Sequence, residues 1–202
     1  MCAKMLKMKK VELFIINLAN LSKDDLFKFK LTDDELNKIK NNKNALQDAA
    51  SLYLKKRFIG EYSLNEHDKP ISDKVKFNIS HSKDYVVLAI SDVDVGVDIE
   101  KIRPFKPNMI DFVSIKEEKE AIIDDESFFK VWTAKEALLK CLGAGLSLPL
   151  KIVPALPFEG KKDFQKQLFY SKQMKIDDYI LTVTIGSKSN FKIDLKEIKL
   201  DK

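Results

Sequence analysis

Hydrophobic and polar residues alternate in short segments of the chain, with the period of two that is typical of half-buried β-strands. The segment 75–79 alternates in this way, and continuous apolar runs predict buried strands at 13–16, 85–90 and 95–99. Towards the C-terminus, further strands are expected at 164–170, 179–185 and 191–198.

Other segments repeat their apolar residues at helical spacing. The clearest is 127–142, where these residues form a wide stripe and Gly143 provides a C-terminal stop. A second helix is expected over 44–58, with weaker helical regions over 22–40 and 108–123. Thr32, followed three residues later by Glu35, has the spacing of a capping box. Together with the strands, these helices predict a mixed α+β fold.

The composition is that of a soluble globular protein, since 45% of the 202 residues are apolar and 33% are charged. The net charge of +5 is mild and lacks the concentrated basic footprint of a nucleic-acid-binding protein. No apolar stretch approaches the ~20 residues that a membrane span requires. Neither nucleic acid nor a membrane is therefore an expected partner.

Two cysteines, Cys2 and Cys141, are too few for a disulfide framework and indicate free thiols in a reducing compartment. The first apolar run is interrupted by Glu12 and Asn17, so it predicts a strand and not a signal peptide. A cytoplasmic location is expected.

Asp98 and Glu100 are the first candidates for chemistry. On a strand, alternate residues share a face, so both carboxylates point the same way. Two neighbouring anions repel each other unless a cation lies between them, and carboxylate oxygens on a rigid strand suit Mg²⁺. The alternative is a strand end that emerges into solvent with both acids hydrated.

Glu136 and Lys140 lie four residues apart on one face of the clearest helix. They could supply a third carboxylate for a metal and a cation for phosphate charge, or form an ordinary surface ion pair. Lys135, beside them, could equally be a solvated surface residue. His81 ends a strand between two serines, where it could donate to a phosphate oxygen or cap a turn.

Several other chemistries are not indicated. The chain has no glycine-rich dinucleotide motif, no Walker A loop and no nucleophile elbow. Its two histidines and two cysteines do not have the spacing of zinc ligands.

In their order along the chain, these residues resemble the 4′-phosphopantetheinyl transferase superfamily, in particular its larger, surfactin-synthetase-type branch. The blocks G-x-D-I-E, ending at Glu100, and W-x-x-K-E-x-x-x-K, beginning at Trp132, are highly specific when they occur together. The other resembling segments are Lys69-Pro70, Phe77 to Ser82, Phe112 to Ser114 with Glu117, and Gly143 to Ser147.

The resemblance implies two similar α/β halves related by a pseudo-two-fold axis, which we place at residues 1–103 and 104–202. Coenzyme A would bind in the cleft between them. The implied reaction is Mg²⁺-dependent transfer of the 4′-phosphopantetheine group from coenzyme A to a serine of an apo carrier protein, with release of 3′,5′-ADP. Two fused halves would form a complete site, so a monomer is expected.

The resemblance also implies a role for each motif residue. Asp98, Glu100 and Glu136 resemble the acidic triad that holds Mg²⁺, and Lys140 the lysine that steadies phosphate charge and protonates the leaving group. Glu117 resembles a glutamate that deprotonates the carrier serine, although Glu118 and Glu120 are alternatives for that position. Contacts with the nucleotide are implied for Ser80, His81, Lys69 and Pro70.

One departure from the family pattern concerns the 3′-phosphate of coenzyme A. Larger family members carry an arginine before the serine of the long N-terminal helix, whereas this chain reads Gln47-Asp48-Ala49-Ala50-Ser51. The candidates to replace it are Lys43, Arg57 and a lysine within 28–40.

Two other functions therefore stay open. One is a coenzyme A-binding homologue without transferase activity, and the other is a metal-dependent phosphodiesterase that uses the same carboxylates to activate water. The type of carrier protein does not follow from the sequence.

Overall fold

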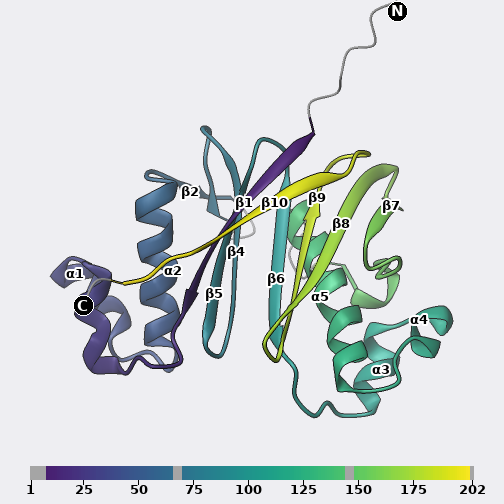
Figure 1. The fold of residues 1–202 in the computed structure, drawn as a ribbon, viewed down its shortest axis with the longest axis horizontal. Coiled ribbons are helices and arrows are strands. Elements are labelled where there is room, and N and C mark those ends of the chain that lie inside the picture. Colours follow the sequence, from purple (N-terminus) through teal and green to yellow (C-terminus); the bar gives the residue numbers. More distant parts are fainter. Residues whose placement is uncertain (1–7, 66–69, 144–147, 201–202) are drawn as a thin grey trace, which may run out of the picture.

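The computed structural model describes residues 8–65, 70–143 and 148–200, and it contains two four-stranded sheets that lie side by side (Figure 1). The first sheet has the order β10-β1-β5-β4. Its strands are β1 (Lys9–Asn17), β4 (Lys76–Ser82), β5 (Tyr85–Ser91) and β10 (Phe191–Glu197). All its pairings are antiparallel except that of β1 with β10, which is parallel.

The second sheet is antiparallel and has the order β6-β9-β8-β7. Its strands are β6 (Val95–Lys101), β7 (Gly160–Phe164), β8 (Gln167–Ile176) and β9 (Tyr179–Ile185). A small ribbon of β2 (Ser63–Leu64) and β3 (Pro70–Ile71) lies apart from both sheets.

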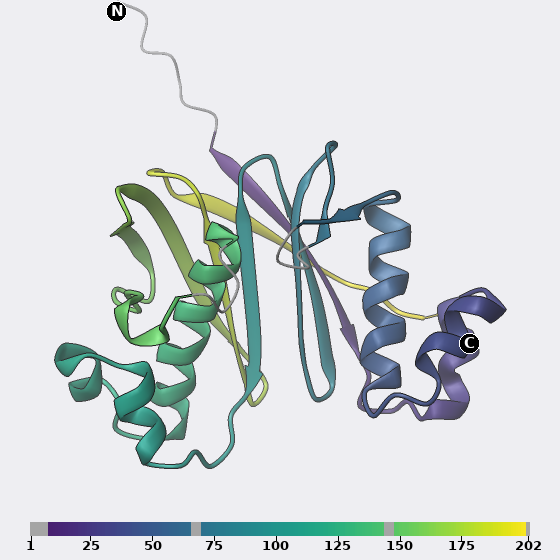
Figure 2. The same ribbon diagram turned by 180° about the vertical axis from the view of Figure 1, so that it is seen from behind.

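Each sheet carries its own helices, at opposite ends of the molecule (Figures 1 and 2). The first sheet is covered by the 3₁₀ helix η1 (Lys23–Phe29), α1 (Asp33–Ile39) and α2 (Ala45–Phe58). The second is covered by α3 (Asn108–Val113), α4 (Lys116–Glu120), α5 (Asp125–Leu142) and the 3₁₀ turn η3 (Leu150–Ile152). Among the described residues, no helix has the length and apolarity of a membrane span.

The two sheets share an apolar core. Val11, Leu13 and Ile15 of β1 pack with Val97 and other residues of the second sheet, and their side chains are nearly inaccessible to solvent. The alternate residues of β1, including Phe14 and Ile16, face the opposite way and pack under α2. Because successive side chains of a strand point to opposite faces, β1 contributes to both cores.

The sheets also meet along a seam between β4 and β6, and polar side chains make the contact there. Alternate residues of β4 accept hydrogen bonds from backbone N–H groups of β6: Asn78 from Val97 at 2.9 Å, Ser80 from Ile99 at 3.4 Å, and Ser82 from Lys101 at 3.2 Å. β6 is an edge strand, so its outward N–H groups would otherwise be unpaired in the interior. These bonds therefore fix the register of β6 relative to β4 of the first sheet.

The α+β class is confirmed, and most of the predicted elements are present. The predicted strand 164–170 is instead a hairpin of β7 and β8, whose turn residues Gln165 and Lys166 both have positive φ angles. Such turns usually carry asparagine or glycine, and this one carries neither, which is why the sequence did not reveal it. The helical regions 22–40 and 108–123 are each divided into two short helices.

The strands do not divide between the sheets at residue 103. β6 precedes that position but belongs to the second sheet, and β10 follows it but belongs to the first. Asp98 and Glu100 therefore lie in the same sheet unit as the helix that carries Glu136 and Lys140. The division into halves at residues 1–103 and 104–202 and their pseudo-two-fold relationship stay predictions.

Candidate active site

The candidate site lies where α5 packs closely on β6. Gly96 makes this approach possible, because a Cβ atom there would meet the carbonyl oxygen of Ala137 at 2.0 Å and the backbone nitrogen of Cys141 at 2.3 Å. The capping bond from the Ser127 N–H to Asp124 Oδ1, 2.7 Å long, starts the helix, and Gly143 ends it in the left-handed conformation.

Six of the predicted site residues line one hollow of about 380 Å³ between β4, β6 and α5. Its lining residues are Ile79, Ser80, His81, Asp98, Glu100, Trp132, Glu136 and Lys140. Trp132 is half-buried against Phe128 and also lines the hollow.

Asp98 is buried beneath this hollow and uses only one of its two carboxylate oxygens for hydrogen bonds. Oδ1 accepts from Lys140 Nζ at 2.6 Å and from Ser80 Oγ at 3.0 Å. Oδ2 is buried and has no hydrogen-bond partner within the described structure. Burial raises the pKa of Asp98, and Lys140 opposes that rise.

Glu100 repeats the same arrangement. Its Oε2 accepts from Ser82 Oγ and from the Arg103 guanidinium, both at 2.8 Å. No hydrogen bond from the described residues reaches Oε1. In each of the two β6 carboxylates, the hydrogen-bond donors therefore reach one oxygen, and the other oxygen accepts no hydrogen bond from the described residues.

Glu136 and His81 complete the charged lining of the hollow. Burial raises the pKa of Glu136, and the neighbouring Asp98 and Glu100 raise it further. His81 is exposed at the mouth, yet partial desolvation lowers its pKa, and Lys140 contributes to the lowering. Three acidic side chains thus share one hollow with a single lysine.

The donor set suits a hard divalent cation. A buried carboxylate oxygen without a partner, beside two further carboxylates, is the chemistry that Mg²⁺ selects. Within residues 8–65, 70–143 and 148–200, however, no group of three or more histidine, cysteine or acidic side chains already has metal-binding spacing. Lys140 and Arg103 pair with the β6 carboxylates instead.

Two predicted residues do not line this hollow, and a third lies outside the described residues. Glu117 is exposed on α4 and does not line it. Pro70 lines a separate hollow of about 60 Å³ next to Phe77 and Asp94, and Lys69 lies outside the described residues.

The alternatives for Glu117 can also be placed. Glu118 is buried in an ion pair of 2.7 Å with Lys135, which is fully buried and also donates to the carbonyl oxygens of Leu150 and Val153. Lys135 is therefore not the surface residue that the sequence allowed, and this pair fastens α4 to α5. Glu120 is exposed.

A second, basic hollow of about 280 Å³ lies at the turn between β4 and β5, and Lys83 in its lining follows His81 of the first hollow by two residues. Lys23, Lys43 and Lys83 line it together with Gln47, whose amide donates to the Lys83 carbonyl oxygen at 2.9 Å. Arg57 is near the other end of α2, where it donates to the Tyr53 hydroxyl.

Sequence reasoning missed Ser82 and Arg103 as partners of Glu100. Ser82 had a usable signal, because it shares a strand face with Ser80 two residues earlier. Arg103 had none, since its contact depends on how the chain turns after β6.

Comparison with known proteins identifies the segment that builds most of this site. Residues 94–184 match the family model of the 4′-phosphopantetheinyl transferase superfamily. The 4′-phosphopantetheinyl transferase gsp of Aneurinibacillus migulanus is 38% identical over 96 residues, which are 43% of this chain and 39% of that protein. The 4′-phosphopantetheinyl transferase Sfp of Bacillus subtilis is 37% identical over 98 residues, 44% of each chain.

A shorter match to the 4′-phosphopantetheinyl transferase AcpT of Escherichia coli is 40% identical over 76 residues, 33% of this chain and 39% of that protein. The matched stretches span less than half the length of each of these relatives. They confirm the resemblance that the sequence motifs indicated. Residues 94–184 of this chain are therefore similar to the 4′-phosphopantetheinyl transferase superfamily.

Proposed function

We propose that this protein transfers the 4′-phosphopantetheine group from coenzyme A to a serine of an apo carrier protein and releases 3′,5′-ADP. The observation that carries the proposal is the pair of carboxylates on β6, each with one oxygen left over, facing Glu136 and Lys140 in one hollow. This arrangement lies within the segment that matches the family model.

The reaction joins the serine oxygen to the β-phosphorus of coenzyme A and breaks the bond from that phosphorus to the bridging oxygen of the pyrophosphate. Lys140 is placed to stabilise negative charge on the departing phosphate and to give it a proton, because its ammonium already faces the hollow. A carboxylate must take the proton of the serine.

For that base, Glu136 has better support than Glu117. Glu136 lines the hollow next to Asp98, Glu100 and Lys140, where the reacting phosphate would lie. Glu117 is exposed on α4 outside the hollow, and it could act only if the carrier protein brought its serine there.

Asp98, Glu100 and Glu136 would hold a Mg²⁺ ion. When bound, the ion neutralises pyrophosphate charge and polarises the phosphorus–oxygen bond. The fit rests on the unpartnered Oδ2 of Asp98 and on the donor-free Oε1 of Glu100.

The 3′-phosphate of coenzyme A is assigned to the basic hollow. Lys83 lines it two residues after His81, in the β4–β5 turn, and Lys43 lines it from the segment before α2, so we expect one nucleotide to reach both hollows. These lysines replace the arginine that this chain lacks. Ser80, His81, Pro70 and Lys69 keep their proposed contacts with the rest of the nucleotide.

The proposed partner is a carrier protein, and the protein is proposed to act as a cytoplasmic monomer. The carrier class is open. Cys141 is a buried thiol that donates to the Asp94 carbonyl oxygen at 3.3 Å, which is consistent with a reducing compartment.

Intact-mass spectrometry tests the proposal. The purified protein is incubated with coenzyme A, Mg²⁺ and either an apo acyl carrier protein or an apo peptidyl carrier domain, beside a reaction with chelator. A mass gain of one phosphopantetheine group, abolished by chelator, is the expected result. Bound coenzyme A without any transfer would support an inactive homologue, and hydrolysis of a model diester without a carrier would support a phosphodiesterase.

A further inference from the structure

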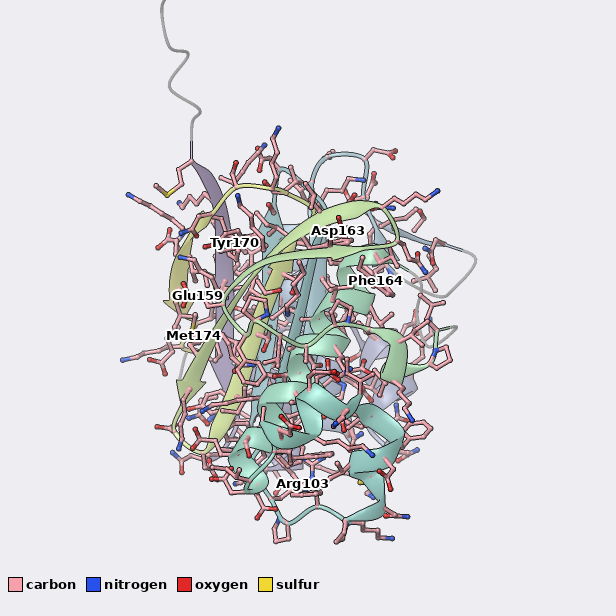
Figure 3. The ribbon with its side chains drawn as sticks, turned by 90° about the vertical axis from the view of Figure 1, so that its right-hand side faces the viewer. Arg103, Glu159, Asp163, Phe164, Tyr170 and Met174 are labelled. Carbon is pink, nitrogen blue, oxygen red and sulfur yellow. The ribbon has the colours of Figure 1, made fainter. Side chains whose placement is uncertain are left out.

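Arg103 comes three residues after Glu100, the second carboxylate of β6, and contacts it. Its Nη1 donates to Glu100 Oε2 at 2.8 Å and to the Lys101 carbonyl oxygen at 2.8 Å. The guanidinium lies over the ring of Phe129, 4.6 Å from its centroid, and Phe129 is a buried residue of α5. In Figure 3 the residue is labelled at the lower end of the molecule, where the chain turns from β6 towards α3.

The choice of arginine here is informative. Of the 36 lysines and arginines in the chain, only Arg57 and Arg103 are arginines. A planar guanidinium can lie flat on an aromatic ring and donate in its own plane at the same time. Arg103 therefore acts through the planar shape of its guanidinium as well as through its charge.

The two donors to Glu100 act on a single atom. Ser82 from β4 and Arg103 from the segment after β6 both reach Oε2. A carboxylate held by two donors on one oxygen cannot rotate freely, so Oε1 keeps a fixed direction. The Glu100 side chain is 21% exposed and lines the hollow, which leaves Oε1 as its available ligand atom.

We propose that Arg103 is a positioning residue, which acts with Ser82 to lock the Glu100 carboxylate so that Oε1 is presented to a divalent cation. The inference rests on the proposed function, since it assigns a role in the site that would hold Mg²⁺. Arg103 itself touches neither the ion nor coenzyme A in this role.

Loss of Arg103 should change the affinity for a divalent ion in opposite directions, depending on whether the arginine acts through its charge or by orienting Glu100. Removing a cation next to a carboxylate would tighten the binding of a divalent ion, although solvent screens a guanidinium that is 46% exposed. Loss of orientation would weaken binding, and partners of metal ligands typically contribute about 10–100-fold to metal affinity. The sign of the change therefore separates the two roles.

The experiment measures Mn²⁺ binding to the full chain by electron paramagnetic resonance. Arg103→Met keeps the contact with Phe129 but removes the donors, and Arg57→Met is its matched control, because Arg57 also lies over aromatic rings but outside the site. Ser82→Ala removes the other donor without changing the charge. Binding of coenzyme A in the presence of chelator reports whether each variant keeps the fold of the hollow.

We expect Arg103→Met and Ser82→Ala each to weaken Mn²⁺ binding about tenfold, with Arg103→Lys in between and Arg57→Met unchanged. Coenzyme A binding without metal should stay within about twofold in all four variants. Unchanged or tighter Mn²⁺ binding by Arg103→Met would overturn the role of Arg103 alone. A wild-type protein that binds no Mn²⁺ and transfers nothing would overturn the proposed function as well.

If Arg103→Met does not fold, Ser82→Ala and Arg103→Lys decide the question. Full Mn²⁺ affinity in both would contradict the locking of Glu100. A loss in Ser82→Ala together with partial loss in Arg103→Lys would support it.

Discussion

The hydroxyl of Tyr179 donates a hydrogen bond of 2.8 Å to Oδ2 of Asp84, and this bond joins two hairpins of different sheets. Tyr179 begins β9, and Asp84 lies in the turn between β4 and β5. The reverse contact is also present, because Tyr85 at the start of β5 donates to Asp177 in the turn before β9 at 2.6 Å. The two tyrosine rings meet edge to face with centroids 4.8 Å apart. We call these four residues the hairpin clasp.

The clasp should contribute measurably to stability. Tyr179→Phe removes the bond to Asp84 and also the bond that the Asp84 N–H donates to the hydroxyl. We expect the free energy of unfolding to fall by about 1–2 kcal/mol, as measured by urea denaturation. Tyr85→Phe should have a similar effect, and a double variant should show coupling between the two bonds. An unchanged urea midpoint in both single variants would show that the clasp contributes nothing.

Gly96 should not tolerate a methyl group. In Gly96→Ala the new Cβ would overlap backbone atoms of Ala137 and Cys141, so α5 must move away from β6. We expect a loss of roughly 3 kcal/mol in unfolding free energy, and lower transfer activity because Glu136 and Lys140 move with the helix. Gly186→Ala is the control, since the nearest atom to its Cβ would be 3.5 Å away, and it should stay within about 0.5 kcal/mol of wild type.

Two conservative substitutions test whether Glu117 acts as the base. Glu136→Gln should lower the single-turnover rate of transfer at least ~100-fold, because it removes the carboxylate that lines the hollow. Glu117→Gln, an exposed position on α4, should stay within about threefold of wild type if it has no general-base role. The rates are measured by quenched mass analysis with saturating coenzyme A. The opposite ranking would return the role of base to Glu117.

Lys162 should make stability depend on pH. Its Nζ is buried without a hydrogen-bond partner in the described structure, and burial lowers its pKa to about 7, against a smaller opposing effect of Glu118. Lys135 is the other charged group that acts on it. Between pH 7 and about 10 the unfolded chain binds this proton and the folded chain does not, so stability rises with pH across that window.

Lys162→Met should remove this dependence. We expect the variant to be more stable than wild type at pH 7, on the order of 2 kcal/mol, with a difference that shrinks by pH 9.5. Urea unfolding at both pH values checks this. A constant difference between the two proteins at both pH values would mean that Lys162 does not titrate in the window.

The predictable part of the site is the part that is local in sequence. Asp98 with Glu100, and Glu136 with Lys140, each lie within one periodic element, so their common faces follow from strand and helix geometry. The ends of α5 could equally be predicted from the sequence, because a capping aspartate and a terminal glycine are short-range signals.

The seam could not be predicted, because its bonds join residues 18 or 19 positions apart through side chains. An ordinary strand pair would have satisfied β6 with backbone bonds, and no sequence pattern shows that Asn78, Ser80 and Ser82 do so instead. The burial of Lys135 was hidden for a similar reason. Its partner Glu118 lies in a separate helix, and a lysine next to a glutamate usually indicates a solvated face.

The parallel pairing of β10 with β1 affects how the chain can fold during its synthesis. Phe191–Glu197 completes the first sheet, yet it leaves the ribosome after the whole of the second sheet. Until then one edge of β1 has no strand to pair with, while Val11 and Leu13 belong to the core of the finished protein. The N-terminal sheet is therefore the first to start forming and the last to be completed. A nascent chain that stalls before Phe191 would expose the unpaired edge of β1, and such an edge promotes aggregation.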